Sequence, residues 1–219
     1  MVASARRTGT ETSRTRGVLL DCVEQLMLEE GYAAVTFRAV AAKAGVTPSL
    51  VQYYFGTLDG IFLAAIRRYT ERNIRHLTEA LEVPLGQLPR VLWDYSRTEA
   101  ASALTTEFMA LGNHRESVRA EIAEATERVR KLQLDALSQG ADGPRFLDRK
   151  ITPGSLLLLI TGIPKFLALE EGIGVRTAHQ ELIGAFEEFL GPVPATVDKG
   201  KAARPRRGRP GGRLQTRQP

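Results

Sequence analysis

Between positions 17 and 190, apolar residues recur every three or four residues, and no segment of strand length alternates apolar with polar side chains. This spacing is typical of amphipathic helices, which repeat one buried face about every 3.6 residues. The clearest case predicts the buried seam of a long helix ending near Gly140, through Val118, Ile122, Ala125, Val129, Leu132 and Ala136. The pattern therefore predicts an all-α fold.

Glycine, proline and threonine residues mark the expected helix ends. A first helix is expected to stop at Gly31, because glycine favours the left-handed C-cap conformation. Thr47 before Pro48 predicts a helix start, since threonine accepts a first-turn amide and proline loses no hydrogen bond at that position. The predicted helices are 15–30, 37–44, 48–55, 58–81, one containing Trp93 after Pro89, 102–113, the seam helix, 153–171 and 177–190, with a loop over 141–152.

The net charge of +5 is distributed unevenly along the chain. Residues 1–16 carry +3 and residues 196–219 carry +7, which leaves −5 on residues 17–195. A mildly acidic body with two basic ends favours a polyanion such as DNA contacted by flexible arms, but a solvated tail that aids solubility has the same charge pattern. Pro, Gly, Arg and Lys dominate from residue 191 onward, which predicts a disordered basic tail over 192–219.

Several classes of protein are disfavoured by composition. The longest apolar run, residues 156–160, is far shorter than the roughly 18 residues of a membrane span. The first arginines are not followed by the apolar stretch of a signal peptide. A cytoplasmic protein is therefore expected. Cys22 is the single cysteine and lies in a helical core stripe, which favours a structural role. His76, His114 and His179 have no acidic or thiol partners at ligand spacing, and no catalytic motif is present, so neither a metal, a cofactor nor an enzyme is predicted.

Two short helices joined by residues 44–47 form a helix-turn-helix, in which Gly45 turns the chain and Val46 fills the space between the helices. The second helix of such a unit lies in the DNA major groove, with its N-terminal residues at the base edges.

At this motif the sequence resembles the TetR family of bacterial transcriptional regulators. Residues 31–55 carry a glycine-aromatic turn (Gly31-Tyr32), a capping Thr36, Ala-Gly-Val at 44–46 and a closing Tyr54-Phe55, and the likeness covers about 45 residues from Arg16 to Phe62. The resemblance implies about nine helices, with a DNA-binding domain over 17–57 and a domain over 58–191 that binds a ligand and dimerises through its last two helices. The charge pattern predicts a flexible basic arm over 1–16.

The resemblance also implies which residues meet DNA. Arg38 is expected to reach guanine or a phosphate, and Gln52 an adenine edge, while Val51 and Phe55 turn inward. The family usually has Gly in place of Ser49, Tyr in place of Gln52 and a phosphate-binding Lys in place of Leu58. The implied DNA-binding set within the domain is Thr36, Arg38, Thr47, Pro48, Ser49, Gln52, Tyr53 and Tyr54.

The tail segment 205–213 contains Arg-Gly-Arg-Pro, which resembles an AT-hook whose Arg207 and Arg209 enter a narrow A·T minor groove. An ordinary solvated tail of this composition would contain the same letters.

Two further sets belong to the predicted ligand-binding and dimerisation domain. Trp93, Phe108, Met109 and Phe166 lie in helices that the family uses to line its cavity, where a small apolar effector would suit them, although core packing explains them equally well. The last two predicted helices are very apolar and suit a subunit interface or the protomer core; the interface residues predicted are Leu156, Leu159, Ile160, Leu182, Phe186 and Phe189.

The sequence therefore predicts a ligand-responsive regulator that binds double-stranded operator DNA as a homodimer, most simply a repressor on a palindrome. Two alternatives remain open: a nucleoid-type or activating DNA binder without a physiological ligand, and a helical small-molecule binder that has lost DNA binding.

Overall fold

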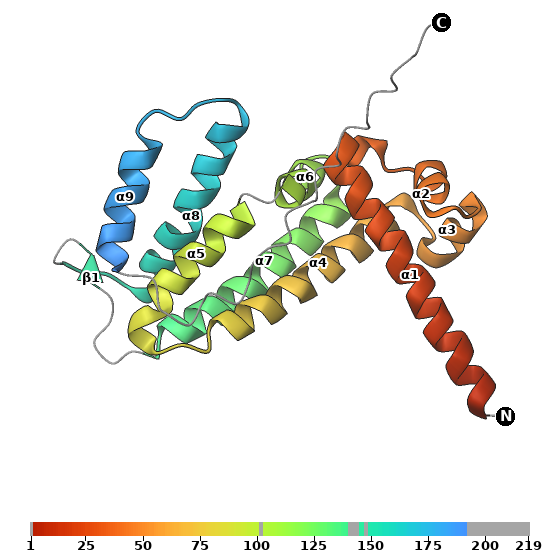
Figure 1. Cartoon of the computed structure of the whole chain (residues 1–219), viewed down its shortest axis with the longest axis horizontal. Helices are drawn as coiled ribbons and strands as arrows, with labels where there is room; N and C mark the ends of the chain where they lie inside the picture. The colour runs from red at the N-terminus through yellow and green to blue at the C-terminus, as the bar shows by residue number, and fades with distance from the viewer. Residues whose placement is uncertain (1, 101–102, 140–144, 147–148, 192–219) are drawn as a thin grey trace, which may run out of the picture.

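The structure is a computed structural model, and it describes residues 2–100, 103–139, 145–146 and 149–191. Nine α-helices, two short 3-10 turns and one two-stranded hairpin occur in this part of the chain (Figure 1). The all-α prediction is confirmed. The helices are α1 (Val2–Glu30), α2 (Phe37–Ala44), α3 (Pro48–Phe55), α4 (Leu58–Ala80), α5 (Leu88–Ala100), α6 (Ala103–Gly112), α7 (Glu116–Leu137), α8 (Pro153–Gly172) and α9 (His179–Leu190).

The helix-turn-helix forms where the local signals place it. The Thr36 hydroxyl accepts a 3.0 Å hydrogen bond from the Ala39 amide and caps α2. Gly45 ends α2 in the left-handed region at φ 68°, and the Val46 amide then donates to the Ala41 carbonyl at 2.9 Å. The predicted bounds of α2 and α3 agree with the structure residue for residue.

The junction between α3 and α4 is tight. The Thr57 hydroxyl caps α4 by accepting a 3.0 Å hydrogen bond from the Gly60 amide. A Cβ placed on Gly60 would lie 2.1 Å from the carbonyl oxygen of Phe55. Only glycine allows the last turn of α3 to approach α4 this closely, so Gly60 fixes the angle between these helices.

Two expectations for the fold are wrong. Helix α1 starts at Val2, so the segment expected to be a flexible arm continues the helix; no proline interrupts residues 2–16. In the expected loop over 141–152, strands β1 (Arg145–Phe146) and β2 (Arg149–Lys150) pair antiparallel. Two-residue strands have too few positions to show an alternating pattern, so periodicity could not reveal them.

The helices form two parts in Figure 1: α1 to α3 at one end, and α4 to α9 as an elongated body. Two apolar clusters of buried side chains correspond to this arrangement. The first joins α1, α2 and α3 to α4, α6 and α7, with Leu19, Val23, Val51 and Phe62 at its centre. The second joins α4, α5, α8 and α9. Helix α4 contributes to both clusters and therefore connects the two parts.

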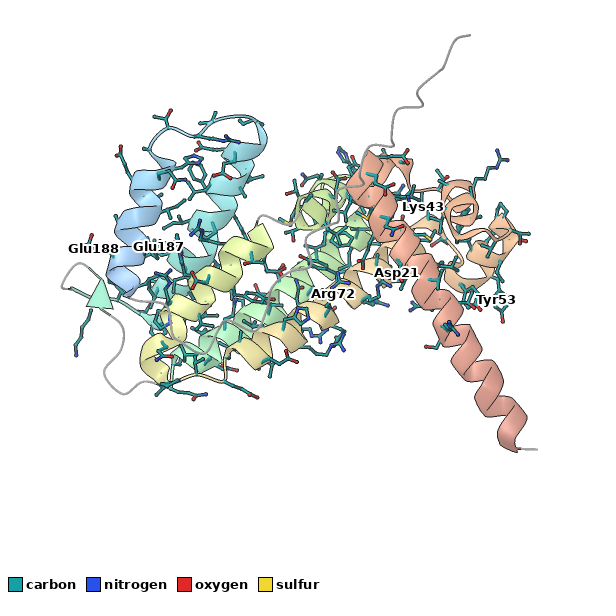
Figure 2. The ribbon with its side chains drawn as sticks, viewed as in Figure 1. Asp21, Lys43, Tyr53, Arg72, Glu187 and Glu188 are labelled. Carbon is teal, nitrogen blue, oxygen red and sulfur yellow. The ribbon has the colours of Figure 1, made fainter. Side chains whose placement is uncertain are left out.

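Ion pairs also attach α1 to α4. The Arg68 guanidinium on α4 lies 2.8 Å from Asp21 and 2.8 Å from Glu24, and it donates to the Gly17 carbonyl at 3.0 Å. Arg72 lies one turn further along α4, 3.3 Å from Glu24. Figure 2 shows Asp21 and Arg72 on the facing sides of α1 and α4. A bidentate guanidinium holds both distance and angle, so this cluster fixes the orientation of the first helix on the body.

Helices α8 and α9 lie side by side at the end of the body farthest from α3 (Figure 1). The buried His179 imidazole at the start of α9 lies 2.7 Å from Glu170 and 3.5 Å from Glu171 on α8, acidic neighbours that the sequence spacing did not reveal. By length and composition α8 is the one described helix apolar enough to cross a bilayer, yet Leu156 and Ile160 pack it into the body core.

Candidate nucleic-acid interface and ligand cavity

Helix α3 presents a polar face away from the body. Val51 and Phe55 are buried on its inner side, as expected, and Tyr54 is half-buried. The outer side carries Tyr53, which is 79% exposed and extends beyond the ribbon in Figure 2. The exposed residues of this face are Thr47, Pro48, Ser49, Gln52 and Tyr53. A short helix with one polar face free along its length matches the width of a DNA major groove.

The neighbouring polar groups complete this surface. Arg38 is exposed on the first turn of α2, next to the capping Thr36. The Thr47 hydroxyl makes no capping hydrogen bond, contrary to expectation; it lies 3.0 Å from the Ser49 hydroxyl. Both hydroxyls are exposed and therefore accessible to a phosphate oxygen. Arg207 and Arg209, the expected AT-hook residues, lie outside the described residues.

Leu58, which replaces a basic residue of the family pattern, has a structural role. Its half-buried side chain packs against the first cluster at the start of α4. On the other side of the same junction, the Arg16 guanidinium lies 5.5 Å from the centre of the Phe55 ring. A cation on α1 is thus held close to α3, although Leu58 supplies none.

The body contains a cavity of about 520 Å³ between α4, α5, α6, α7 and α8. Pockets of this size accommodate small organic ligands. Phe108 and Met109 line it, whereas the other two expected lining residues do not. Trp93 is fully buried and stacks on Phe186 with ring centres 4.5 Å apart, and Phe166 is exposed on the outside of α8. Helical periodicity places a side chain on a face but does not show which neighbour that face meets.

A hydrogen-bonded cluster forms one wall of the cavity. Oε2 of Glu99 accepts from the Tyr69 hydroxyl at 2.7 Å and from the Asn73 amide at 2.6 Å. The Tyr95 hydroxyl donates to the Asn73 carbonyl at 3.0 Å. Burial, with Glu99 nearby, raises the pKa of Tyr95 well above its usual range, so its hydroxyl stays protonated. Sequence analysis missed this cluster, because its residues come from two helices that show no shared motif.

The cavity is also lined by basic and amide side chains. Arg130 and Gln133 lie one turn apart on α7, and Lys165 faces them from α8. Among the described residues, none is hydrogen-bonded or ion-paired to these three side chains, and Gln133 is only 5% exposed. Burial, and then the neighbouring Arg130 cation, lower the pKa of Lys165, while Glu99 acts in the opposite direction.

Helix α6 lies between the cavity and the helix-turn-helix. Thr105, Phe108 and Met109 line the cavity from this helix. On another side of the same helix, the Glu107 carboxylate accepts a 2.7 Å hydrogen bond from the Tyr32 amide, in the turn between α1 and α2. One short helix therefore contacts both the cavity and the segment that carries α2.

The outer surface of α8 and α9 has an apolar stripe. Leu158 is 53% and Phe166 56% exposed, and Gly162 lies between them on the same face. Leu169 is 62% exposed at the end of this stripe and also lines the cavity. Leu182 and Phe189 of α9 are exposed in addition. Of the six predicted interface residues, Leu156, Ile160 and Phe186 are buried inside the protomer, and Leu159 is half-buried. The face that a partner could cover on α8 therefore runs through Leu158 in place of Leu156 and Ile160.

Comparisons with known proteins agree with this geometry. Residues 19–65 match a family described as "Bacterial regulatory proteins, tetR family". Over 61 residues the chain is 36% identical to the HTH-type transcriptional regulator BetI of Rhizobium meliloti (strain 1021), a match that spans 28% of this chain and 30% of that relative. The match to this relative therefore covers less than a third of either chain.

Solved structures extend the likeness to most of the fold. The reduced form of NemR from E. coli is similar with a TM-score of 0.66 at 20% identity, covering 83% of this chain and 100% of that one. A protein from Saccharomonospora viridis, described as a transcriptional regulator in complex with choline, gives a TM-score of 0.64 at 16% identity, covering 80% of this chain and 96% of that one. At such identities the likeness concerns the fold alone.

Proposed function

Because this chain belongs to the TetR family of bacterial regulatory proteins, we propose that it is a ligand-responsive, sequence-specific DNA-binding regulator of transcription. It acts as a cytoplasmic homodimer that represses transcription from a palindromic operator. The observation that carries the proposal is the outer face of α3, where Ser49, Gln52 and Tyr53 are exposed while Val51 and Phe55 hold the helix in the core.

The roles on this surface follow from side-chain chemistry. The Gln52 amide matches the N6 and N7 atoms of adenine, and the Arg38 guanidinium matches O6 and N7 of guanine. Thr36, Thr47 and Tyr54 position the domain through phosphate oxygens, helped by the free amides at the starts of α2 and α3.

The proposed dimer uses the apolar stripe of α8 and α9. Exposed side chains of this size at helical spacing are costly in water, and a two-fold axis lets the same stripe on two protomers cover itself. Gly162 lets the two helices approach closely, because it has no side chain there. The dimer places two α3 helices on half-sites one helical turn apart, about 34–36 Å.

The ligand enters the 520 Å³ cavity and acts through α6. A ligand that fills the cavity displaces Phe108 and Met109, and the Glu107 contact passes this shift to Tyr32 and so to α2. To move the population from 99:1 to 1:99, the ligand must favour one arrangement by about 5.5 kcal/mol. The S. viridis protein in complex with choline supports a ligand role for this fold.

Selection of genomic fragments by the purified full-length protein, followed by sequencing, tests the proposal. We expect enrichment of one palindromic sequence, and the same selection with a variant carrying both Arg38→Ala and Gln52→Ala should not enrich it. A folded wild-type protein that enriches no sequence, or that enriches the same sequences as this variant, would contradict sequence-specific binding by α2 and α3.

A further inference from the structure

We propose that the cavity binds an amphipathic organic anion, whose acid group lies between Lys165, Arg130 and Gln133 and whose apolar body lies along Ile66, Phe108 and Ile122. This inference rests on the proposed regulatory function and goes beyond it by assigning the chemical class of the ligand. The anionic group is a carboxylate or an equivalent acid.

Three polar side chains of the cavity, Arg130, Gln133 and Lys165, have no hydrogen-bond partner in the described part of the chain. They are two cations and a buried amide, from α7 and α8, and among the described residues none of them has an ion-pair partner either. Gln133 is buried and Arg130 half-buried, whereas Lys165 is exposed. Polar groups that have lost part of their hydration gain stability when a partner replaces it. An acid group supplies this partner to all three at once, because each oxygen accepts two hydrogen bonds.

The charge balance in the cavity also favours an anionic ligand. Arg130, Lys165 and Glu99 are its three formally charged side chains, so the cavity carries an excess of one positive charge. Repulsion from Arg130 adds to burial in lowering the pKa of Lys165. An anionic ligand offsets the repulsion between Lys165 and Arg130, whereas a cationic ligand would increase it.

The acidic and aromatic groups of the cavity are not available to a cationic ligand. Glu99 and the rings of Tyr69 and Phe108 would otherwise suit an organic ammonium ion. However, the Arg72 guanidinium already lies 5.3 Å from the centre of the Tyr69 ring, and the Phe108 ring packs edge-on at 5.6 Å. Oε2 of Glu99 already accepts two hydrogen bonds. The aromatic and acidic groups are therefore engaged by the protein itself.

Most of the remaining surface of the cavity is apolar. Ile66, Phe108, Met109, Ile122, Val129 and Leu169 contribute side chains from α4, α6, α7 and α8. A ligand with only an acid group would leave this apolar surface exposed to water. A ligand without an acid group would leave Arg130 and Lys165 unpaired. An acid with an apolar body of about 8 to 10 heavy atoms satisfies both surfaces and fits a pocket of this class.

The test compares matched ligands that differ only in charge. Octanoate and 4-phenylbutanoate are titrated into the full-length protein by isothermal calorimetry, next to their primary amides and octyltrimethylammonium. We expect each carboxylate to bind at least about tenfold more tightly than its amide, a difference of about 1.4 kcal/mol. In Lys165→Met this preference should fall to about threefold or less, while Lys165→Arg retains it and Lys131→Met, an exposed lysine on α7, binds like the wild type.

Three results would overturn the proposal: carboxylates and amides that bind equally well, tighter binding of the ammonium compound, or a folded protein that binds neither carboxylate. Each result is distinguishable from failure of the proposed function, because operator binding by the ligand-free protein is measured separately. If the protein binds its operator selectively but shows no preference for carboxylates, it is a regulator that responds to another class of ligand. Loss of operator selectivity refutes the regulatory proposal, whatever the cavity binds.

Discussion

The Glu107 carboxylate on α6 accepts a 2.7 Å hydrogen bond from the backbone amide of Tyr32, which lies 75 residues earlier in the chain. Tyr32 follows Gly31, whose φ of 83° turns the chain from α1 toward α2. A Cβ on Gly31 would lie 3.5 Å from Oε2 of Glu107, so the carboxylate sits directly against this turn. The pair is the polar link between a helix that lines the cavity and the segment that leads to the proposed DNA-reading helices.

Replacing Glu107 by alanine should weaken this link. Glu107→Ala leaves the part-buried Tyr32 amide without its acceptor, and we expect the free energy of unfolding to fall by about 1–3 kcal/mol in urea denaturation. Glu107→Gln keeps an acceptor oxygen and should lose less. The ligand-induced change in operator affinity should shrink in the alanine variant. An unfolding free energy equal to that of wild type would show that the amide finds water instead and that the link contributes nothing.

Glycine at position 60 should be indispensable for a different reason. In Gly60→Ala the new Cβ would meet the backbone carbonyl of Phe55, which cannot move without shifting the end of α3. We expect a loss of about 1–3 kcal/mol in unfolding free energy and weaker operator binding. Gly184→Ala in α9 is the matched control, since nothing lies within 4 Å of the added carbon, and it should stabilise the helix by up to about 1 kcal/mol. Equal thermal transitions for the two variants would contradict a tight junction.

Base reading by α2 and α3 predicts a specific pattern of loss. Arg38→Ala and Gln52→Ala should each reduce operator affinity by about 1–3 kcal/mol and relax the base preference at one symmetric pair of positions. Measurement on the selected operator and on single-base variants of it separates the two effects. Lys131→Ala, far from this surface on α7, is the control. Equal weakening on every sequence would assign both residues to phosphate contacts.

Local signals in the sequence were sufficient for most of the fold. Thr36, Gly45 and Pro48 act through hydrogen bonds and φ angles within one turn of the chain, so the bounds of α2 and α3 could be predicted to the residue. Side chains of the recognition face were placed correctly for the same reason, because burial of Val51 and Phe55 fixes the exposure of Gln52 by helical spacing.

The cavity and the exposed stripe could not be predicted in this way. Trp93 and Phe186 stack on each other across two helices that are distant in the sequence, and their apolar character is the same in a core, a cavity wall or an interface. Lys165 carries no signal that it lines a cavity, since it is exposed, as lysines ordinarily are. Which helix faces which is decided by tertiary packing, and a single sequence does not record it.

The proposed interface on α8 can be tested with one variant on its exposed stripe and another in the protomer core. Leu158→Glu places a charge on an exposed position of the apolar stripe and should leave the protomer folded but monomeric, because two carboxylates would meet across the dimer axis. Sedimentation should show half the wild-type mass, with operator binding lost. A Leu158→Glu protein that stays dimeric would place the interface elsewhere.

Phe186 lies in the protomer core and not on the exposed stripe, so a substitution there should affect folding. It is 4% exposed and stacks on the fully buried Trp93. Phe186→Ala should therefore lower the unfolding free energy by about 3–5 kcal/mol through a cavity. If the Phe186→Ala protein were stable but monomeric, Phe186 would have to be assigned to the dimer interface instead.

The last prediction concerns the pH dependence of anion binding in the cavity. Burial and the Arg130 cation hold the pKa of Lys165 below its usual range, and a bound carboxylate raises it again by favouring the charged form. The ligand binds the protonated lysine, so the affinity is fully present below the pKa of the free protein and declines as the pH rises through it. The raised pKa of Tyr95 keeps its hydroxyl from titrating in the same range. Calorimetry with octanoate between about pH 7 and 10, where the ligand is fully ionised, should show this decline together with proton uptake on binding. Lys165→Met should show weak binding that does not vary with pH. A wild-type affinity that is constant or rises over this range would mean that the Lys165 ammonium does not contact the acid group.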